Sequence, residues 1–564
     1  MRLPLSSLVV ALALGTSAPV FAQEAAPSSA PAPAPAPAAE AAPRTPPKLI
    51  VAISVDQYSS DLFQQYRERY SKGLNRLLTG AVFPSGFQSH AATETCPGHS
   101  TLLTGVHPNR TGIPANSWFE PGIGREDKEV YCSEDETNPA SNSQDSVISP
   151  MHLKVPTLGD LLKAKNPATL NVAVSAKDRA VVMMSGHTSD AAYWIKGKGF
   201  VTYDDRKLSA AAVAQNAAIT KAVEAGDGDL PAPGWCAPYD HAVNLGSFSI
   251  GTFRFPIKPG DYKSYLNGPR VDDVTTDMAI RLLDEMPLGK DDVPDVLSVS
   301  YSANDKVGHA FGTEGVEMCI QQNVLDATIG RLLAALDARG IDYAVVLSAD
   351  HGGIDAPERL KLQGVPEASR LDPALTDKGL SALVSKATGI VPKDGPLLYG
   401  AGASGDIWLN AGLTAAQRKK VIATLMTQLK ANPQIAGAYT ADELAKVKVP
   451  AGHPQDWTLI ERVAASFVPG RSGDVLMMTK RAVVPGVAPR PGGASTHGSP
   501  WDYDRRVPML FWRKGLTTME QPQPVETVDI APTLAALVGL SEPAGTWDGR
   551  CLDIYAGEAD SCSR

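Results

Sequence analysis

The stretch KLIVAISVD, residues 48–56, is almost entirely apolar and rich in β-branched side chains up to its final aspartate. A continuous apolar run of this length, in place of an alternating one, is typical of a strand that is buried on both faces of a parallel sheet. The run ends at Asp56. We therefore expect a central strand whose carboxyl end presents an acidic side chain.

The same arrangement recurs along the chain. Four more runs predict buried strands, at residues 170–175 (LNVAVS), 295–301 (DVLSVSY), 343–348 (YAVVLS) and 507–512 (VPMLFW). Helical patterns, such as the one at residues 321–336, lie between them. Such alternation predicts an α/β fold with a central, mostly parallel sheet and helices on both faces. Residues 116–165 and 355–500 are expected to contain insertions beside this sheet.

The amino terminus has the features of a secretion signal. Arg2 is followed by a short apolar run and, at Ala22, by a small-residue cleavage signature, which predicts a signal peptide over residues 1–22. Residues 23–47 are rich in Ala and Pro and predict a disordered linker before a catalytic domain at residues 48–564. The apolar run is too short to span a membrane. We expect a secreted, periplasmic or extracellular protein without a membrane anchor.

Export determines how the six cysteines are interpreted. An even number of cysteines in an oxidising compartment favours disulfides. The sequence contains no C-x-x-C pair, the signature of many zinc fingers and redox motifs. Pairing by order along the chain gives the hypothesis Cys96 with Cys132, Cys236 with Cys319, and Cys551 with Cys562.

Composition and charge exclude some function classes. Hydrophobic residues make up 43% and charged residues 20%, which is ordinary for a globular protein. The net charge is -9, and no run of Lys and Arg is present that would follow a phosphate backbone. Nucleic acid is therefore not expected as a specific partner.

Polar side chains follow the predicted strands, where ligands bind in α/β sheets. They offer three carboxylates and three imidazoles, a donor set that suits zinc without any cysteine. Each residue alone is more typical of a helix cap or a hydrogen-bonded core group, but their joint occurrence indicates a metal site. The six candidate donors are Asp56, Asp305, His309, Asp350, His351 and His497.

The segment TETCPGHSTLLTG, residues 93–105, predicts a short helix with Thr95 at its N-cap, Pro97 in its first turn and Gly105 at its end. An ordinary capped helix would explain this pattern. A helix N-terminus is also an anion site, so a hydroxyl there is well placed to attack a phosphoryl group.

The order of these motifs resembles the alkaline phosphatase superfamily, and within it the PafA/PhoK type of bacterial alkaline phosphatase. The resemblance covers residues 48–564 and implies the fold of that superfamily. The motifs that carry it are the strand-end Asp56, T-C-P-G-H at 95–99, N-S-W-F at 116–119, K-D-R at 177–179, N-D-x-x-G-H at 304–309, A-D-H-G-G at 349–353, T-H-G at 496–498 and V-D-I-A-P-T-L at 528–534.

The resemblance implies two zinc ions per chain. One zinc ion would be bound by Asp305, His309 and His497. The other would be bound by Asp56, Asp350 and His351, with Thr95 beside it as metal ligand and nucleophile. Additional structural calcium or magnesium ions are compatible with the resemblance. The other seven histidines are expected to be structural: His90, His99, His107, His152, His187, His241 and His453.

The resemblance also implies a phosphate clamp of Asn116, Lys177 and Arg179. Two fixed cations favour the dianion of a phosphate monoester over the singly charged diester. The expected activity is therefore that of a zinc-dependent phosphomonoesterase, which acts through a covalent phospho-threonine and releases inorganic phosphate from small-molecule monoesters. We expect a monomer.

Four alternatives stand beside this hypothesis. The nearest is a phosphodiesterase or nucleotide pyrophosphatase of the same superfamily. A sulfatase is disfavoured because His99 stands where that resemblance would require Arg, and a serine hydrolase because residues 98–102 lack the final glycine of a G-x-S-x-G turn. From a different class, a secreted binding protein without catalytic activity could keep the same fold.

Overall fold

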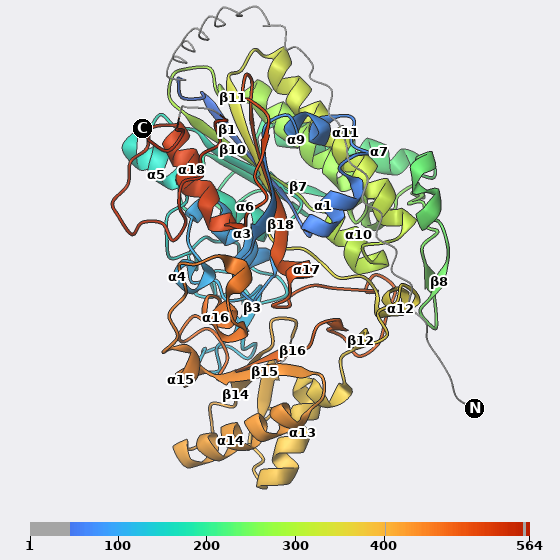
Figure 1. Ribbon diagram of the computed structural model, residues 1–564, viewed down its shortest axis with the longest axis vertical. Coiled ribbons are helices and arrows are strands. Elements are labelled where there is room, and N and C mark those ends of the chain that lie inside the picture. The colour runs from blue at the N-terminus through green and yellow to red at the C-terminus, as the bar shows by residue number, and fades with distance from the viewer. Residues whose placement is uncertain (1–44, 401, 557–559, 564) are drawn as a thin grey trace, which may run out of the picture. The chain divides into compact units, whose positions relative to one another are not determined.

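The predicted central strand is β1 (Leu49–Val55), and every residue in it is buried. In the computed structural model, β1 pairs in parallel with β10 (Asp295–Tyr301) on one side and β11 (Tyr343–Ser348) on the other (Figure 1). Beyond β10, β5 (Asn171–Ser175) continues the parallel arrangement. The parallel core of the sheet is thus confirmed, and the carboxyl ends of these strands meet at one edge.

Antiparallel pairs follow β11 on the other side of this core. The predicted strand at residues 507–512 is β18 (Arg506–Arg513), which runs antiparallel to both β11 and β2 (Ala81–Phe87). Over the residues that the structure describes, 45–400, 402–556 and 560–563, the main sheet has ten strands in the order β19-β2-β18-β11-β1-β10-β5-β6-β7, with β20 paired to β2. The strands not yet located are β6 (Ala191–Lys196), β7 (Gly199–Val201), β19 (Met519–Glu520) and β20 (Val525–Glu526).

Helices cover both faces of the sheet (Figure 1). The residues of β1 alternate between two apolar clusters, with Leu49, Val51, Ile53 and Val55 in one and Ile50 and Ala52 in the other. The first cluster includes side chains of α7 (Ala210–Ala225), α9 (Arg270–Glu285) and α11 (Val316–Ala338). The second includes side chains of α3 (Thr95–Thr104), α5 (Leu158–Lys165) and α18 (Ile530–Leu537). Burial on both faces explains why the β1 sequence does not alternate with polar residues.

The remaining helices differ widely in length. They are α1 (Ser60–Tyr66), α2 (Gly73–Leu77), α4 (Pro108–Thr111), α6 (Asp178–Ser185), α8 (Tyr262–Leu266), α10 (Ala303–Phe311), α12 (Pro357–Leu362), α13 (Asp377–Thr388), α14 (Ala415–Ala431), α15 (Ala441–Leu444), α16 (Leu459–Ala464) and α17 (Asp502–Arg505).

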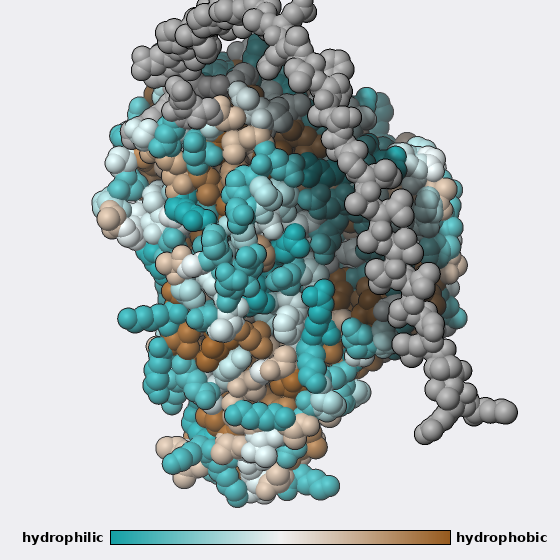
Figure 2. Space-filling view, viewed as in Figure 1, coloured by the Kyte–Doolittle hydropathy of each residue, from teal (hydrophilic) through white to brown (hydrophobic). Residues whose placement is uncertain are grey.

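Two regions of the chain form structure outside the main sheet. Within residues 116–165, β3 (Ser117–Phe119) and β4 (Glu129–Tyr131) form an antiparallel hairpin. Residues 355–500 contain a second sheet with its own apolar cluster, packed against α13 and α14. Its strands are β13 (Leu398–Gly400), β14 (Asp406–Leu409), β15 (Ile435–Thr440) and β16 (Val475–Thr479). Hydrophilic side chains dominate the face shown in Figure 2, with hydrophobic patches between them.

The three expected disulfides are all formed. Their Cα–Cα distances are 6.5 Å for Cys96–Cys132 and 5.8 Å for both Cys236–Cys319 and Cys551–Cys562. The pairing predicted from chain order is confirmed.

The predicted signal peptide, residues 1–22, and the predicted linker up to residue 44 lie outside the described residues. Within the described part of the chain, no helix combines the length and the apolar character needed to cross a bilayer.

A buried histidine joins the start of α4 to the carboxyl-terminal part of the chain. His107 is 4% exposed, and its Nδ1 and Nε2 atoms each lie 3.1 Å from a carboxylate oxygen, of Asp548 and Glu526 respectively. Burial alone would lower the pKa of His107, but the hydrogen bonds and charges of Asp548 and Glu526 raise it from 6.5 to about 9. The charged form of His107 therefore stabilises the folded state.

This contact predicts how stability changes with pH. Because the folded pKa is above the unfolded one, the stabilisation is complete below pH 6.5 and is lost as pH rises through 9. The shift corresponds to about 3 kcal/mol. Thermal unfolding of wild type and His107→Gln should show a gap in melting temperature that is largest at pH 6 and shrinks by pH 10. A gap that is constant over this range would contradict the assignment.

Candidate functional site

The six predicted metal donors converge at the carboxyl ends of the parallel strands. Asp56 follows β1, and Asp305 and His309 lie on α10, which begins just after β10. Asp350 and His351 follow β11, and His497 comes from the loop before α17, almost two hundred residues after α10. All six side chains are buried except His309, whose side chain is 32% exposed. The structure thus brings together residues that are far apart in the sequence.

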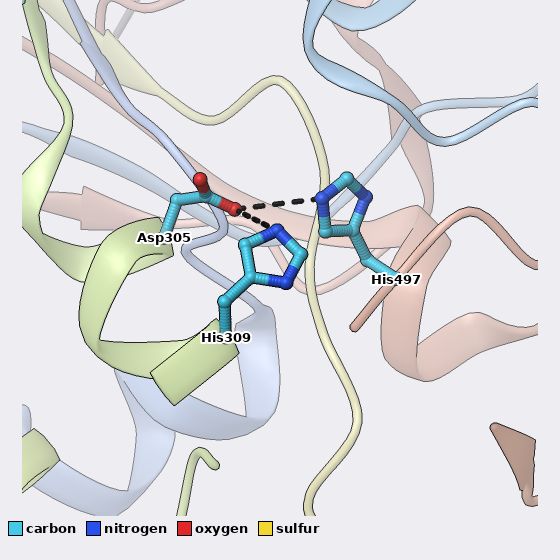
Figure 3. Close-up of side chains that lie close together, drawn as sticks. All are labelled: Asp305, His309 and His497. Atoms are coloured by element: carbon cyan, nitrogen blue, oxygen red, sulfur yellow. Dashed lines mark ion pairs between the residues drawn. The ribbon is translucent and has the colours of Figure 1, made fainter. Parts of the chain in front are cut away.

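Asp305, His309 and His497 form the first group (Figure 3). The Nε2 atoms of His309 and His497 lie 3.1 and 3.4 Å from Oδ1 of Asp305. Their Nδ1 atoms are 3.1 Å from the carbonyl oxygen of Ser495 and 2.8 Å from that of Thr93. Nδ1 must carry the proton to donate to these carbonyls, so the lone pair of each Nε2 is left for a metal ion.

The second group surrounds His351. Its Nε2 atom lies 3.5 Å from Oδ1 of Asp56 and 3.4 Å from Oδ2 of Asp350, while its Nδ1 is 2.8 Å from the carbonyl oxygen of Gly352. Asp305 also reaches this group, since ligand atoms of Asp56, Asp305 and His351 lie within 4.8 Å of one another. The two groups are therefore adjacent.

The arrangement fits cations. Four buried atoms, Asp56 Oδ1, Asp305 Oδ1, Asp350 Oδ2 and His351 Nε2, have no hydrogen-bond partner among the residues that the structure describes. Buried polar atoms without partners are costly, and here they face one another across both groups. Burial and the carboxylate of Asp350 raise the pKa of Asp56 to about 7. A divalent ion in each group would give the unpartnered atoms a ligand bond and would balance the buried carboxylate charge. The mixed carboxylate and imidazole donors suit zinc.

Thr95 lies beside these groups. It is the first residue of α3, and Glu94 precedes the helix, so the predicted N-cap position was wrong by one residue. The reason is that the Thr95 hydroxyl does not cap the helix: it accepts hydrogen bonds of 3.4 Å from both Lys177 Nζ and Arg179 Nη2. Gly105 ends the helix in the left-handed conformation, as predicted.

Helix α3 is packed closely against the end of β11. A Cβ atom at Gly98 would lie 1.9 Å from the carbonyl oxygen of Asp350. Only glycine permits this approach. It fixes the distance between the N-terminus of α3 and the second group of donors.

The three residues of the predicted phosphate clamp lie around Thr95. Lys177 immediately precedes α6 and Arg179 lies in its first turn. Oδ1 of Asn116 accepts a hydrogen bond of 2.8 Å from the backbone N–H of Cys96. Lys177 Nζ also donates to Asp56 and Asp305 at 2.5 and 2.6 Å, so its ammonium group neutralises part of the carboxylate charge.

Tyr131 was not singled out from the sequence. Its hydroxyl accepts from Arg179 Nη1 at 3.3 Å and donates to Asp178 at 2.5 Å. Tyr131 also precedes Cys132, whose disulfide partner Cys96 follows Thr95. A closed ring of covalent and hydrogen bonds thus joins the threonine to the arginine that contacts it.

We expected His99 to be structural. Its Nδ1 lies 2.9 Å from the carbonyl oxygen of Thr95 and 3.0 Å from Oδ2 of Asp350, and its Nε2 lies 2.9 Å from the hydroxyl of Ser300. It therefore lies between Thr95 and a predicted metal ligand. The spacing offered a signal, because His99 is four residues after Thr95 and so lies one turn along the same helix.

A large cavity opens onto the site. It has a volume of about 1760 Å³, and its lining includes Lys177, Arg179, Asp305 and His309. A bound phosphate group would fill only a small part of this space, so the cavity has room for the rest of a substrate.

Residues 50–500 match the model of the type I phosphodiesterase / nucleotide pyrophosphatase family. The chain belongs to this family. It is 49% identical to the alkaline phosphatase PhoK of Sphingomonas sp over 99% of this chain and all of that protein. It is 45% identical to the alkaline phosphatase PhoD of Zymomonas mobilis over 91% of this chain and 89% of that protein.

The crystal structure of the alkaline phosphatase PafA matches this fold with a TM-score of 0.78 and 27% identity, over 92% of this chain and all of that chain. The α/β fold, the resemblance to the PafA/PhoK type and the prediction of an alkaline phosphatase enzyme are confirmed. The alternative of a binding protein without catalytic activity is therefore not supported.

Proposed function

We propose that this enzyme is a zinc-dependent phosphomonoesterase that acts through a covalent phospho-threonine at Thr95. The observation that carries the proposal is the position of the Thr95 hydroxyl. It lies at the N-terminus of α3, within 3.4 Å of Lys177 and Arg179 and beside two adjacent groups of buried metal donors. A hydroxyl in such surroundings can attack a phosphoryl group that the same cations hold.

The reaction requires two displacements at phosphorus. In the first, the Thr95 oxygen loses its proton and forms a bond to phosphorus while the ester P–O bond breaks, and the departing oxygen takes up a proton and leaves as the alcohol. In the second, a water oxygen loses a proton and bonds to phosphorus, the bond to Thr95 breaks, the Thr95 oxygen regains a proton, and inorganic phosphate departs. Zinc ions bound by Asp305, His309 and His497 and by Asp56, Asp350 and His351 would supply the positive charge that lowers the pKa of the attacking oxygens and stabilises the leaving ones.

The side chains of the clamp hold the phosphoryl group during both steps. The guanidinium of Arg179 can donate to two non-bridging oxygens, and Tyr131 fixes its orientation. Lys177 adds a second positive charge. The positive end of the α3 helix dipole also favours an anion at this position.

The charge of this clamp supports a monoester as substrate. A monoester dianion has one more negative charge than a diester. Two fixed cations therefore bind the monoester dianion more strongly than the diester. Phosphodiesterase activity is the second candidate, because the matching family model carries that description.

We extend the proposal to the setting of the enzyme. Three disulfides support export to the periplasm or the medium, where such bonds persist. Small phosphate monoesters are the proposed partners, without nucleic acid or membrane, and the proposed state is a monomer. Additional calcium or magnesium ions remain part of the proposal.

The nucleophile can be tested by trapping the covalent intermediate. Rapid quenching followed by peptide mass analysis should find phosphate on Thr95 in wild type and on the serine hydroxyl in Thr95→Ser. Thr95→Ala should form no phospho-enzyme and lose about 10³-fold or more in kcat, because the attacking oxygen is gone. Phospho-threonine at another position, or near-normal turnover by Thr95→Ala, would show that the nucleophile is misassigned.

The substrate class can be tested by removing both cations of the clamp. Lys177→Ala/Arg179→Ala should lower kcat/KM for phenyl phosphate by about 10²- to 10³-fold and for methyl phenyl phosphate by less than about 10-fold. Lys196→Ala is the matched control, because Lys196 pairs with Asp145 on the surface. Equal losses on the two esters would remove the reason for assigning a monoesterase.

A further inference from the structure

Three aromatic side chains form part of the wall of the cavity that opens onto the site. Phe253, Phe255 and Phe311 line the same cavity as Lys177 and Arg179. The rings of Phe253 and Phe311 are stacked, with centroids 5.3 Å apart and planes 17° apart. Phe255 packs edge-on against both, at 5.3 and 5.6 Å. We call these three residues the aromatic wall.

The aromatic wall is fixed relative to the metal donors. Phe311 is the last residue of α10, the helix that carries Asp305 and His309. A helix is rigid over this short length, so the ring of Phe311 has a set position with respect to both donors. Phe253 is 44% exposed, an unusual exposure for a large aromatic ring, and it faces a cavity.

A buried carboxylate holds the loop that carries Phe253. Glu317, which is fully buried, accepts hydrogen bonds from the backbone N–H groups of Gly251 and Phe253 at 2.8 and 2.9 Å. These bonds leave the ring of Phe253 exposed while its backbone is anchored.

The same loop is strained at Phe255. Its φ angle is 58°, in the left-handed region that a bulky residue rarely adopts. Arg270 donates to the carbonyl oxygen of Phe255 at 2.6 Å and is itself held by Asp227 at 2.6 and 2.8 Å. Backbone strain that the surrounding structure holds in place is concentrated at ligand sites in proteins.

We propose that the aromatic wall is a subsite for a planar aromatic leaving group of the phosphate monoester, such as a nucleobase or an aryl ring. This inference rests on the proposed function. In an in-line displacement the leaving alcohol departs on the side opposite Thr95, so it must occupy the cavity instead of the clamp. A planar ring would stack on the exposed side of Phe253, which Phe311 supports from the other side, whereas a small alkyl group would gain little from this contact. Stacking on one aromatic side chain changes affinity by roughly 5- to 100-fold.

The test compares two monoesters of primary alcohols, adenosine 5′-monophosphate and ethyl phosphate, whose reacting centres are closely matched. Phe253→Ala should raise KM for adenosine 5′-monophosphate by roughly 5- to 30-fold with little change in kcat, and should alter KM for ethyl phosphate by less than about twofold. Phe253→Tyr should restore the wild-type KM and Phe253→Leu should not, because only tyrosine keeps a ring. Because Phe253 is exposed, all three variants should keep the wild-type melting temperature.

Adenosine binding separates this proposal from the proposed function. Calorimetry with adenosine alone requires no turnover, and wild type should bind it at least about fivefold more tightly than Phe253→Ala. If wild type hydrolyses neither ester but still binds adenosine in this way, the proposed function fails and the subsite stands. Equal KM changes for the two esters, or equal adenosine affinities of wild type and Phe253→Ala, would overturn the subsite.

Discussion

The repulsion between buried carboxylates is the constraint on which the site depends. Asp56, Asp305 and Asp350 meet at one edge of the sheet, within a few ångströms of His351 or Lys177, and are shielded from water. Like charges in such surroundings destabilise one another unless positive charge lies near them. Burial, together with the charge of Asp350, raises the pKa of Asp56 to about 7, and the charge of Lys177 acts in the opposite direction. A cation in each donor group would supply the remaining positive charge, and the same charge would then act on a phosphate ester.

The fold provides this arrangement through a few close contacts. Parallel β1, β10 and β11 bring their carboxyl ends to one edge, so that Asp56, α10 and the Asp350–His351 pair start from neighbouring points. Backbone carbonyls fix the imidazoles by their Nδ1 atoms, and Gly98 lets α3 approach the second group. The nucleophile and the clamp are joined by the ring through Tyr131 and the Cys96–Cys132 disulfide. Little of the geometry around Thr95 is therefore left to flexible loops.

Much of this could be predicted from the sequence, because apolar runs identify buried strands and the polar residues after them identify the ligand edge. The continuous apolar run of β1 predicted the central strand, and the four-residue spacing of Asp305 and His309 predicted that both side chains lie on one side of a helix turn. The orientation of β18 could not be predicted, since an apolar run has the same appearance in a parallel and an antiparallel strand. The contact of His99 with Asp350 and the stacking of Phe253 on Phe311 depend on tertiary packing between distant segments. The start of α3 was misplaced by one residue because the Thr95 hydroxyl is used by the clamp.

The most direct test of the account is X-ray diffraction from crystals of the zinc-loaded enzyme, measured just above and just below the zinc absorption edge. The account predicts two anomalous peaks per chain that disappear below the edge. One should lie between Asp305, His309 and His497, and the other between Asp56, Asp350 and His351. A single peak, or peaks away from these six side chains, would contradict the claim that paired cations organise the site.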